Sequence, residues 1–145
     1  MNRARDDRGS VLILGVGLIA VVLLAVAVLA DASVAFLQRQ QLFALADAAA
    51  LAGAQAIDLD AYYADGASAA TRLDAVAVPG RVRAHLERSR AADAIDGLVV
   101  DHITSDGQQV VVALSAPLRL PFLLGLDGSR VAVEARSQLA YRGSG

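Results

Sequence analysis

An uncharged apolar run near the start of the chain constrains its structure more than any other feature. From Val11 to Ala30 no side chain is charged or strongly polar. An α-helix rises about 1.5 Å per residue, so these residues span roughly 30 Å, the thickness of the hydrocarbon core of a bilayer. The run therefore predicts one transmembrane helix over residues 11–30 in a chain of 145 residues.

The charges on either side of this run predict the direction in which the chain crosses the membrane. Arg3, Arg5 and Arg8 precede the run closely. After the run, the first charged residue is Asp31 and the nearest cation is Arg39. Basic residues next to a span tend to remain in the cytoplasm. We therefore expect a single-pass protein of the cell (cytoplasmic) membrane, with its N-terminus inside and its C-terminal domain extracytoplasmic.

A cleaved signal peptide is the alternative to an anchor. The tripeptide Ala30-Asp31-Ala32 resembles the small-residue site that precedes signal-peptide cleavage. The apolar core of a signal peptide usually has about 7–15 residues, and the run in this chain is longer. We therefore expect the helix to remain as an uncleaved anchor.

The helix is expected to continue beyond the membrane. Residues 31–57 contain no proline and only one glycine, Gly53, and most of them are strong helix formers. The simplest interpretation is one helix from about Ser10 to about Ile57, roughly 70 Å long. The expected parts are a cytoplasmic segment, a transmembrane helix, an outward Ala-rich helix and an extracytoplasmic domain, at residues 1–10, 11–30, 31–57 and 58–145.

Small side chains gather on one face of the outward helix. Helical neighbours recur every three or four residues, and residues at this spacing form a stripe along one face of the helix. Gln40 and Asp47 lie on the opposite face, and we expect Ala50 to lie off the stripe. Small residues allow another helix or a sheet to approach closely. Asp47 stands out among alanines, either as an exposed aspartate or as a residue that bonds to a partner subunit. The stripe comprises Leu42, Leu45, Ala49, Ala52 and Ala56.

The rest of the chain predicts a small α+β domain. A loop over residues 58–66 is followed by a helix at about 67–76 and by a second helix, with Pro79 in its first turn, that runs to about Ala92. From Leu98 onward the apolar period changes to that of strands, and Ser105-Asp106-Gly107 predicts a hairpin turn. The long helix can pack on one face of the resulting three-stranded antiparallel sheet. The expected strands are residues 98–103, 109–115 and 130–141.

An apolar loop separates the last two expected strands. Residues 117–126 contain two prolines, together with Phe122 and Leu124, where a polar connection would suffice. Such a patch either covers the core of the sheet or meets lipid or a partner. Because the domain is small and short of core, we expect intramolecular coverage.

No arrangement of side chains predicts catalysis or metal binding. His85 and His102 lie in different expected elements, and the chain has no cysteine. Asp58, Asp60 and Asp65 lack the glycine-centred spacing and the distal glutamate of an EF-hand. The charges of residues 32–145 nearly balance, which gives no sign of nucleic-acid binding. We expect no enzymatic activity, no cofactor, no metal, no small-molecule substrate and no nucleic-acid partner.

Three segments of the chain form a familiar combination. Arg8-Gly9-Ser10 opens directly into the span, and Leu42 to Ala54 reads Leu-Phe-Ala-Leu-Ala-Asp-Ala-Ala-Ala-Leu-Ala-Gly-Ala after Gln-Arg-Gln-Gln. A strand, an apolar proline-containing loop and a strand, from Val110 to Ala140, form the third and weakest segment. In these segments the sequence resembles the TadE/TadG-like family of proteins associated with assembly of tight-adherence (Flp-type) pili. The resemblance implies an envelope protein whose partners are the lipid bilayer and other pilus-assembly or pilin-like proteins.

One departure from the pilin pattern affects the expected role. Pilins that a prepilin peptidase processes carry a glycine at the cut and a glutamate five residues later, whereas the fifth residue after Gly9 is Leu14. The chain is therefore closer to an unprocessed or minor component than to the fibre subunit. We expect a pilus-assembly or minor pilin-like component that acts by helix packing and protein contacts. The alternative is a signal-anchored extracytoplasmic binding module unrelated to pili. The candidate interface residues are Leu45, Asp47, Ala49, Ala52, Ala56, Phe122 and Leu124.

Overall fold

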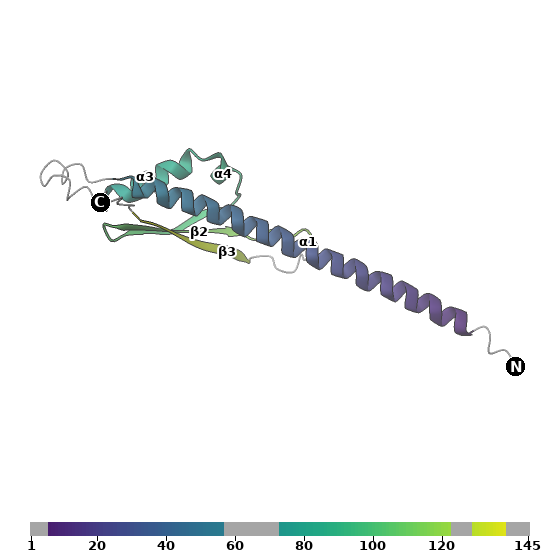
Figure 1. The fold of residues 1–145 in the computed structure, drawn as a ribbon. Helices are drawn as coiled ribbons and strands as arrows, with labels where there is room; N and C mark the ends of the chain where they lie inside the picture. The colour runs from purple at the N-terminus through teal and green to yellow at the C-terminus, as the bar shows by residue number, and fades with distance from the viewer. Residues whose placement is uncertain (1–5, 57–72, 123–128, 139–145) are drawn as a thin grey trace, which may run out of the picture. The chain divides into compact units, whose positions relative to one another are not determined.

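The computed structural model of the chain describes residues 6–56, 73–122 and 129–138, and it confirms an α+β fold (Figure 1). By its contacts the chain divides into two units. The first unit comprises residues 1–36 and 119–127, and the second comprises residues 37–118 and 128–145. The elements are, in chain order, α1 (Asp6–Ala54), α3 (Ala77–Glu87), α4 (Arg90–Asp93), β1 (Val99–Ser105), β2 (Gln109–Pro117) and β3 (Arg130–Gln138).

The long helix predicted from the sequence is confirmed, with shifted ends. α1 has 49 residues, starts at Asp6 rather than near Ser10, and ends at Ala54. No proline interrupts it, so its hydrogen-bond ladder is continuous. At its C-terminal end the N–H of Ala56 donates to the carbonyl oxygen of Gly53 at 3.0 Å. This bond closes a tighter final turn and leaves Ala56 outside the helix.

The sheet of the second unit is three-stranded and antiparallel, with order β1-β2-β3, as predicted. β2 pairs along its whole length with β3, from Gln109 opposite Gln138 to Pro117 opposite Arg130. The pairing of β1 with β2 is interrupted by a bulge at Asp101, between Val100 and His102. β1 and β2 each extend two residues beyond the expected strand ends. Residues 139–141, expected in the third strand, lie outside the described part of the chain.

The core of the second unit lies between the sheet and two helices on the same side of it, α3 and the C-terminal half of α1 (Figure 1). α3 contributes one buried face with residues four apart, and the central strand contributes every second residue, as helical and strand periods require. β3 adds Val133 and Ala135. Because the helical face of α1 is mostly alanine, the valines and leucines of the other elements supply most of the core volume. The main contributors are Val78, Val82 and Leu86 from α3 and Val110, Val112, Leu114 and Ala116 from β2.

The helix expected at residues 67–76 is wrong for the part that the structure describes. The N–H of Leu73 donates to the carbonyl oxygen of Gly107 at 2.8 Å, so this residue bridges to the hairpin turn. The carboxylate of Asp74 then accepts hydrogen bonds from the N–H groups of Val76 (2.8 Å) and Ala77 (3.1 Å). Aspartate that bonds its own backbone in this way favours a turn over a helix. Residues 67–72 lie outside the described residues.

The single helix expected from Pro79 to Ala92 is also wrong, because it is two helices. Pro79 does occupy the first turn, as the third residue of α3. The helix then ends at Glu87, and the short α4 begins at Arg90. Ser89 between them has an extended backbone, with φ −86° and ψ 115°. Arginine and alanine at the junction favour helix intrinsically, so propensity alone gave no warning of the break.

The turn between β1 and β2 is confirmed and is held by one carboxylate. Gly107 has a φ of +88°, which favours glycine. Asp106 accepts hydrogen bonds from the N–H groups of Gln108 (2.9 Å) and Gln109 (2.7 Å). These two bonds, from Gln108 foremost, lower the pKa of the Asp106 carboxyl below its ordinary value, because they favour the charged form.

We expect this turn to loosen in acid. An acidic group whose pKa is lower in the folded chain than in the unfolded chain stabilises the fold at every pH above the unfolded pKa. This stabilisation is lost as the pH falls through the folded pKa. NMR titration of the Asp106 carboxyl carbon in the full chain should give a midpoint below that of an unstructured aspartate. In Asp106→Asn an oxygen acceptor remains but the charge does not, so the acid loosening of the Gly107 amide should disappear. A midpoint at the ordinary value would contradict the assignment.

Candidate functional site

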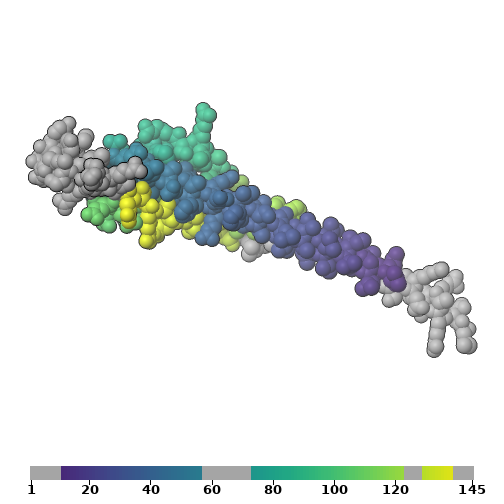
Figure 2. All heavy atoms as spheres, in the orientation of Figure 1, coloured from purple at the N-terminus to yellow at the C-terminus, as the bar shows by residue number. Residues whose placement is uncertain are grey.

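The N-terminal half of α1 presents an apolar surface on all sides. Its large side chains from Val11 to Leu29 are exposed, and they form the surface of this stretch in Figure 2. By length and composition the helix can cross a membrane, with a mean hydropathy of 3.2 over its most apolar window and none of that window buried. A helix that is apolar all round and uncovered by protein is typical of one that meets lipid. This surface indicates a membrane-anchored protein.

From Leu42 onward one face of the same helix is buried within the second unit. Buried positions recur at spacings of three and one, which is the pattern of a single helical face. The expected close approach of a helix or a sheet to small residues is thus made by this chain's own α3 and sheet. Three candidate interface residues, Leu45, Ala49 and Ala56, lie in this core. The buried positions of the face are Leu42, Leu45, Ala46, Ala49, Ala50, Gly53 and Ala54.

The expected position of Ala50 off the stripe is wrong. Its side chain is 0% exposed, whereas Ala52, expected on the stripe, is only half-buried. The buried face runs through residues 46, 49, 50 and 53, and each residue adds about 100° of rotation, so position 52 lies at its edge. The sequence pattern predicts the helix correctly but assigns the centre of its buried face to the wrong residues.

Gly53 lies at a close approach of α1 to its neighbours. A Cβ atom built at this position would lie 2.8 Å from Cγ2 of Val82 and 3.1 Å from Cγ1 of Val110. These neighbours come from α3 and β2, and both are 0% exposed. A methyl group therefore has no space where the three elements meet. Sequence reasoning noted Gly53 as the only glycine between residues 31 and 57 but did not assign it a role.

The side of α1 away from this core carries two large apolar residues around a charge. Asp47 is exposed, as predicted, and Phe43 and Leu51 lie four residues before and after it. Their exposed fractions are 49% and 54%. Residues four apart are neighbours on a helix surface, so the three side chains form one patch, the 43–47–51 patch. Sequence reasoning singled out Asp47 alone and missed its apolar flanks.

Phe122, expected in a loop that covers the sheet's core, is 61% exposed. This residue belongs to the first unit, with the span, rather than to the second. Its backbone N–H donates to Oδ1 of Asp31 at 3.1 Å. Asp31 is only 2% exposed, and it was expected merely as the first charge after the span. Leu124 lies outside the described residues.

The outer face of the sheet is polar and lies over small side chains of the central strand. Glu134 binds the guanidinium of Arg136 with contacts of 2.7 and 2.9 Å, and its other oxygen lies 4.0 Å from Nε2 of His102. Ala113 of β2 pairs with both His102 and Glu134. These charged groups are 40–65% exposed, which is typical of a solvated surface network and gives no enclosed site.

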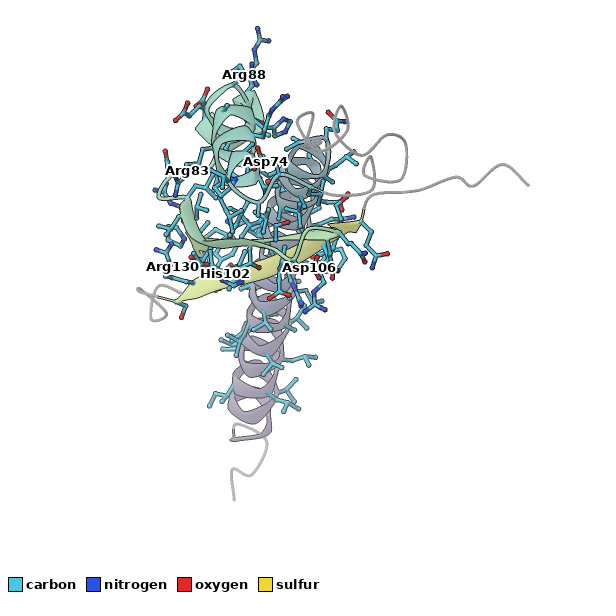
Figure 3. All side chains as sticks on the ribbon, turned by 90° about the vertical axis from the view of Figure 1, so that its left-hand side faces the viewer. Asp74, Arg83, Arg88, His102, Asp106 and Arg130 are labelled. Atoms are coloured by element: carbon cyan, nitrogen blue, oxygen red, sulfur yellow. The ribbon has the colours of Figure 1, made fainter. Side chains whose placement is uncertain are left out.

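A second polar group ties the bulge of β1 to the rest of the sheet. The hydroxyl of Ser115 donates to Oδ1 of Asp101 at 3.0 Å. Nη2 of Arg130 donates to the carbonyl oxygen of Ser115 at 3.2 Å and to its Oγ at 3.1 Å. Arg130 and His102 both lie on the sheet in Figure 3. The serine hydroxyl lies between the Asp101 carboxylate and the Arg130 guanidinium, so these hydrogen bonds join the bulge of β1 to the ends of β2 and β3.

No set of three or more His, Cys, Asp or Glu side chains within residues 11–56, 73–122 and 129–138 is placed to hold a metal ion. His85 lies on α3 and His102 on β1. Asp58, Asp60 and Asp65 lie outside these residues.

The Tad family model, described as "Putative Flp pilus-assembly TadE/G-like", matches residues 9–56. The first third of the chain is similar to this family, and residues 9–56 are called the TadE/G-like segment below. This match covers 48 (9 to 56) of the 145 residues and confirms the predicted resemblance over that segment. No curated protein and no solved structure matches the chain.

The TadE/G-like segment coincides with α1 and its final turn. It begins at Gly9, within the first turns of the helix, and ends at Ala56, directly after it. It therefore includes both the lipid-facing half and the half whose small-residue face is buried. The sheet, α3 and α4 lie outside the matched residues.

Two glycine substitutions test the packing of this segment. Gly53→Ala should lower the free energy of unfolding by about 1–3 kcal/mol, because the new methyl group must displace two tightly packed valines. Gly80→Ala is the matched control, since nothing lies within 4 Å of a Cβ there. It should raise stability by roughly 0.5–1 kcal/mol, as expected for alanine in a helix. Denaturation of both full-length variants in detergent micelles measures the difference, and equal effects would refute the close approach.

Proposed function

We propose that this chain is a single-span component of a Flp/Tad-type pilus-assembly apparatus and that it acts through helix packing and protein contacts. The observation that supports this most is the coincidence of the family match with one helix, residues 9–56 against Asp6–Ala54. That helix has a lipid-facing half and a half that belongs to the core of a small domain. Such a helix holds a domain at a membrane, which is what an assembly component with no chemistry of its own requires.

The expected topology belongs to this proposal. Residues 1–10 lie in the cytoplasm, residues 11–30 cross the membrane, and residues 31–57 lead into an extracytoplasmic domain at 58–145. Arginines precede the span and an aspartate follows it, which is the usual charge asymmetry. The missing glutamate at position 14 favours an unprocessed, minor pilin-like role over that of a fibre subunit.

The 43–47–51 patch is the surface on which we expect a partner to dock. Leu45, Ala49 and Ala56 are committed to the chain's own core, so of the helix candidates Asp47 and Ala52 keep exposed surface. Two exposed apolar side chains, with a carboxylate between them, fit the face of another amphipathic helix that carries a cation or a hydrogen-bond donor. Partner helices of this kind are expected among pilus-assembly or pilin-like proteins.

Deletion of the gene in its native host tests the proposed function. Surface filaments should be lost and should return when the full-length chain is supplied. The Phe43→Ser/Leu51→Ser variant should be made at normal levels but should not restore filaments. Both changes are on the surface, where substitutions usually alter stability by less than about 0.5 kcal/mol.

Val76→Ser is the matched control for that variant. Val76 is 90% exposed and lies in the turn before α3, so its substitution should restore filaments fully. Filaments that persist after deletion of the gene would sink the pilus proposal and would support the alternative, an anchored extracytoplasmic binding module. If the Phe43→Ser/Leu51→Ser variant restores filaments, the 43–47–51 patch is not the docking surface, although the proposed role in pilus assembly still stands.

Topology and processing can be tested on the same chain, which has no cysteine. A membrane-impermeant maleimide applied to intact cells should label Val76→Cys and should leave Asn2→Cys unlabelled until the membrane is opened. Mass spectrometry of membrane fractions should find peptides from residues 11–30. A mature start at Ser10 would instead indicate a processed pilin, and one near Ala32 a secreted domain.

A further inference from the structure

A hydrogen bond in the first unit links the end of the span to a segment 91 residues away. The backbone N–H of Phe122 donates to Oδ1 of Asp31 at 3.1 Å. Asp31 is the first charged residue after the apolar run, and its side chain is 2% exposed. A carboxylate is costly to remove from water unless hydrogen-bond donors satisfy it, and a backbone N–H outside helix or sheet has the same need. The contact satisfies both groups.

The apolar surface of α1 does not stop at Asp31. Residues 32–37 are uncharged, and Phe36 is 67% exposed. From Asp31 to Phe36 the helix rises about 7.5 Å, comparable to the headgroup layer on one side of a bilayer. With residues 11–30 in the hydrocarbon core, Asp31 falls at the boundary between hydrocarbon and headgroups, and the apolar surface of the same helix continues beyond it.

Phe122 is fixed at that same boundary. Because its N–H touches the carboxylate of Asp31, its backbone lies at the depth of Asp31. Its side chain is 61% exposed, and Pro121 beside it is exposed as well. An apolar side chain held there, next to the lipid-facing surface of the helix, meets the acyl boundary of the bilayer, as apolar residues of interfacial segments do.

We propose that Phe122 is a second membrane contact and that its side chain inserts into the outer interface of the bilayer. Asp31 acts as its positioning residue. The occupant of this surface is lipid, because the exposed face of Phe122 continues the uncovered apolar surface of the span. This inference requires the span to be in the membrane but does not depend on a role in pili.

Tryptophan fluorescence tests the contact directly, since the chain contains no tryptophan. Phe122→Trp in the full chain, reconstituted into phosphatidylcholine vesicles, should emit at shorter wavelength than tryptophan in water. Lipids brominated near the headgroup end of the acyl chain should quench it more than lipids brominated near the methyl end. Iodide in the aqueous phase should quench it weakly. Leu18→Trp, within the span, is the deep reference and should show the opposite preference between the two brominated lipids.

The role of Asp31 is tested with a matched pair of variants in the Phe122→Trp chain. Asp31→Asn and Asp31→Ala both remove the charge, but only asparagine keeps an oxygen that accepts the hydrogen bond. Quenching of the introduced tryptophan by shallow bromines should persist in the asparagine variant. In the alanine variant, quenching by shallow bromines should be lost and quenching by iodide should increase. Leu18→Trp in the Asp31→Ala background should still be quenched by deep bromines.

Three results would overturn the proposal. Strong iodide quenching of the Phe122→Trp chain without bromine quenching would place the segment in water. Protection from both quenchers would show that protein covers Phe122. Equal behaviour of the asparagine and alanine variants would show that the hydrogen bond to Asp31 does not position the segment. Failure of Leu18→Trp to be quenched by lipid would instead refute the span itself.

Discussion

The small side chains on one face of α1 are the constraint on which the second unit depends. Where Gly53 meets Val82 and Val110, the space available is less than a methyl group requires. A face of alanine and glycine contributes little apolar area of its own, and its value is that it allows α3 and the central strand to come close. Their valines and leucines then fill the core. The main contribution of α1 to the core is therefore that its small side chains let the other elements pack closely, rather than that they fill volume.

The same helix has a different relation to its surroundings in each half. From Val11 to Leu29 its large side chains are apolar and exposed, as a helix surrounded by lipid requires. In the second half the inward face must be small, whereas the outward face is free to carry Phe43, Asp47 and Leu51. A TadE/G-like match that spans both halves therefore combines an anchor, a packing face and, in our proposal, a docking patch within one continuous element.

The sequence predicts those parts whose signal is repeated over many residues. The long helix follows from its composition, and the three strands follow from alternation around a turn at Gly107. The phase of the helical face was less certain, because alanines at positions 49, 50 and 52 carry almost no difference in hydrophobicity. Ala50 and Ala52 could be told apart only by what packs on them. The end of the helix expected at residues 67–76 was wrong because the side chain of Asp74 forms a local turn that competes with a helix.

The Asp31–Phe122 contact could not be predicted from any local pattern, since the two residues are 91 positions apart. That separation also imposes an order of events during synthesis. Chains grow at about 5–20 residues per second, so the helix bearing Asp31 emerges roughly 5–20 s before Phe122 does. During that interval the carboxylate must keep a partner other than Phe122, and water is the partner at hand. If the helix inserts early, Asp31 remains hydrated on the aqueous side of the boundary until Phe122 has been synthesised. The N–H of Phe122 then replaces a water molecule at the carboxylate, so this hydrogen bond forms late in maturation.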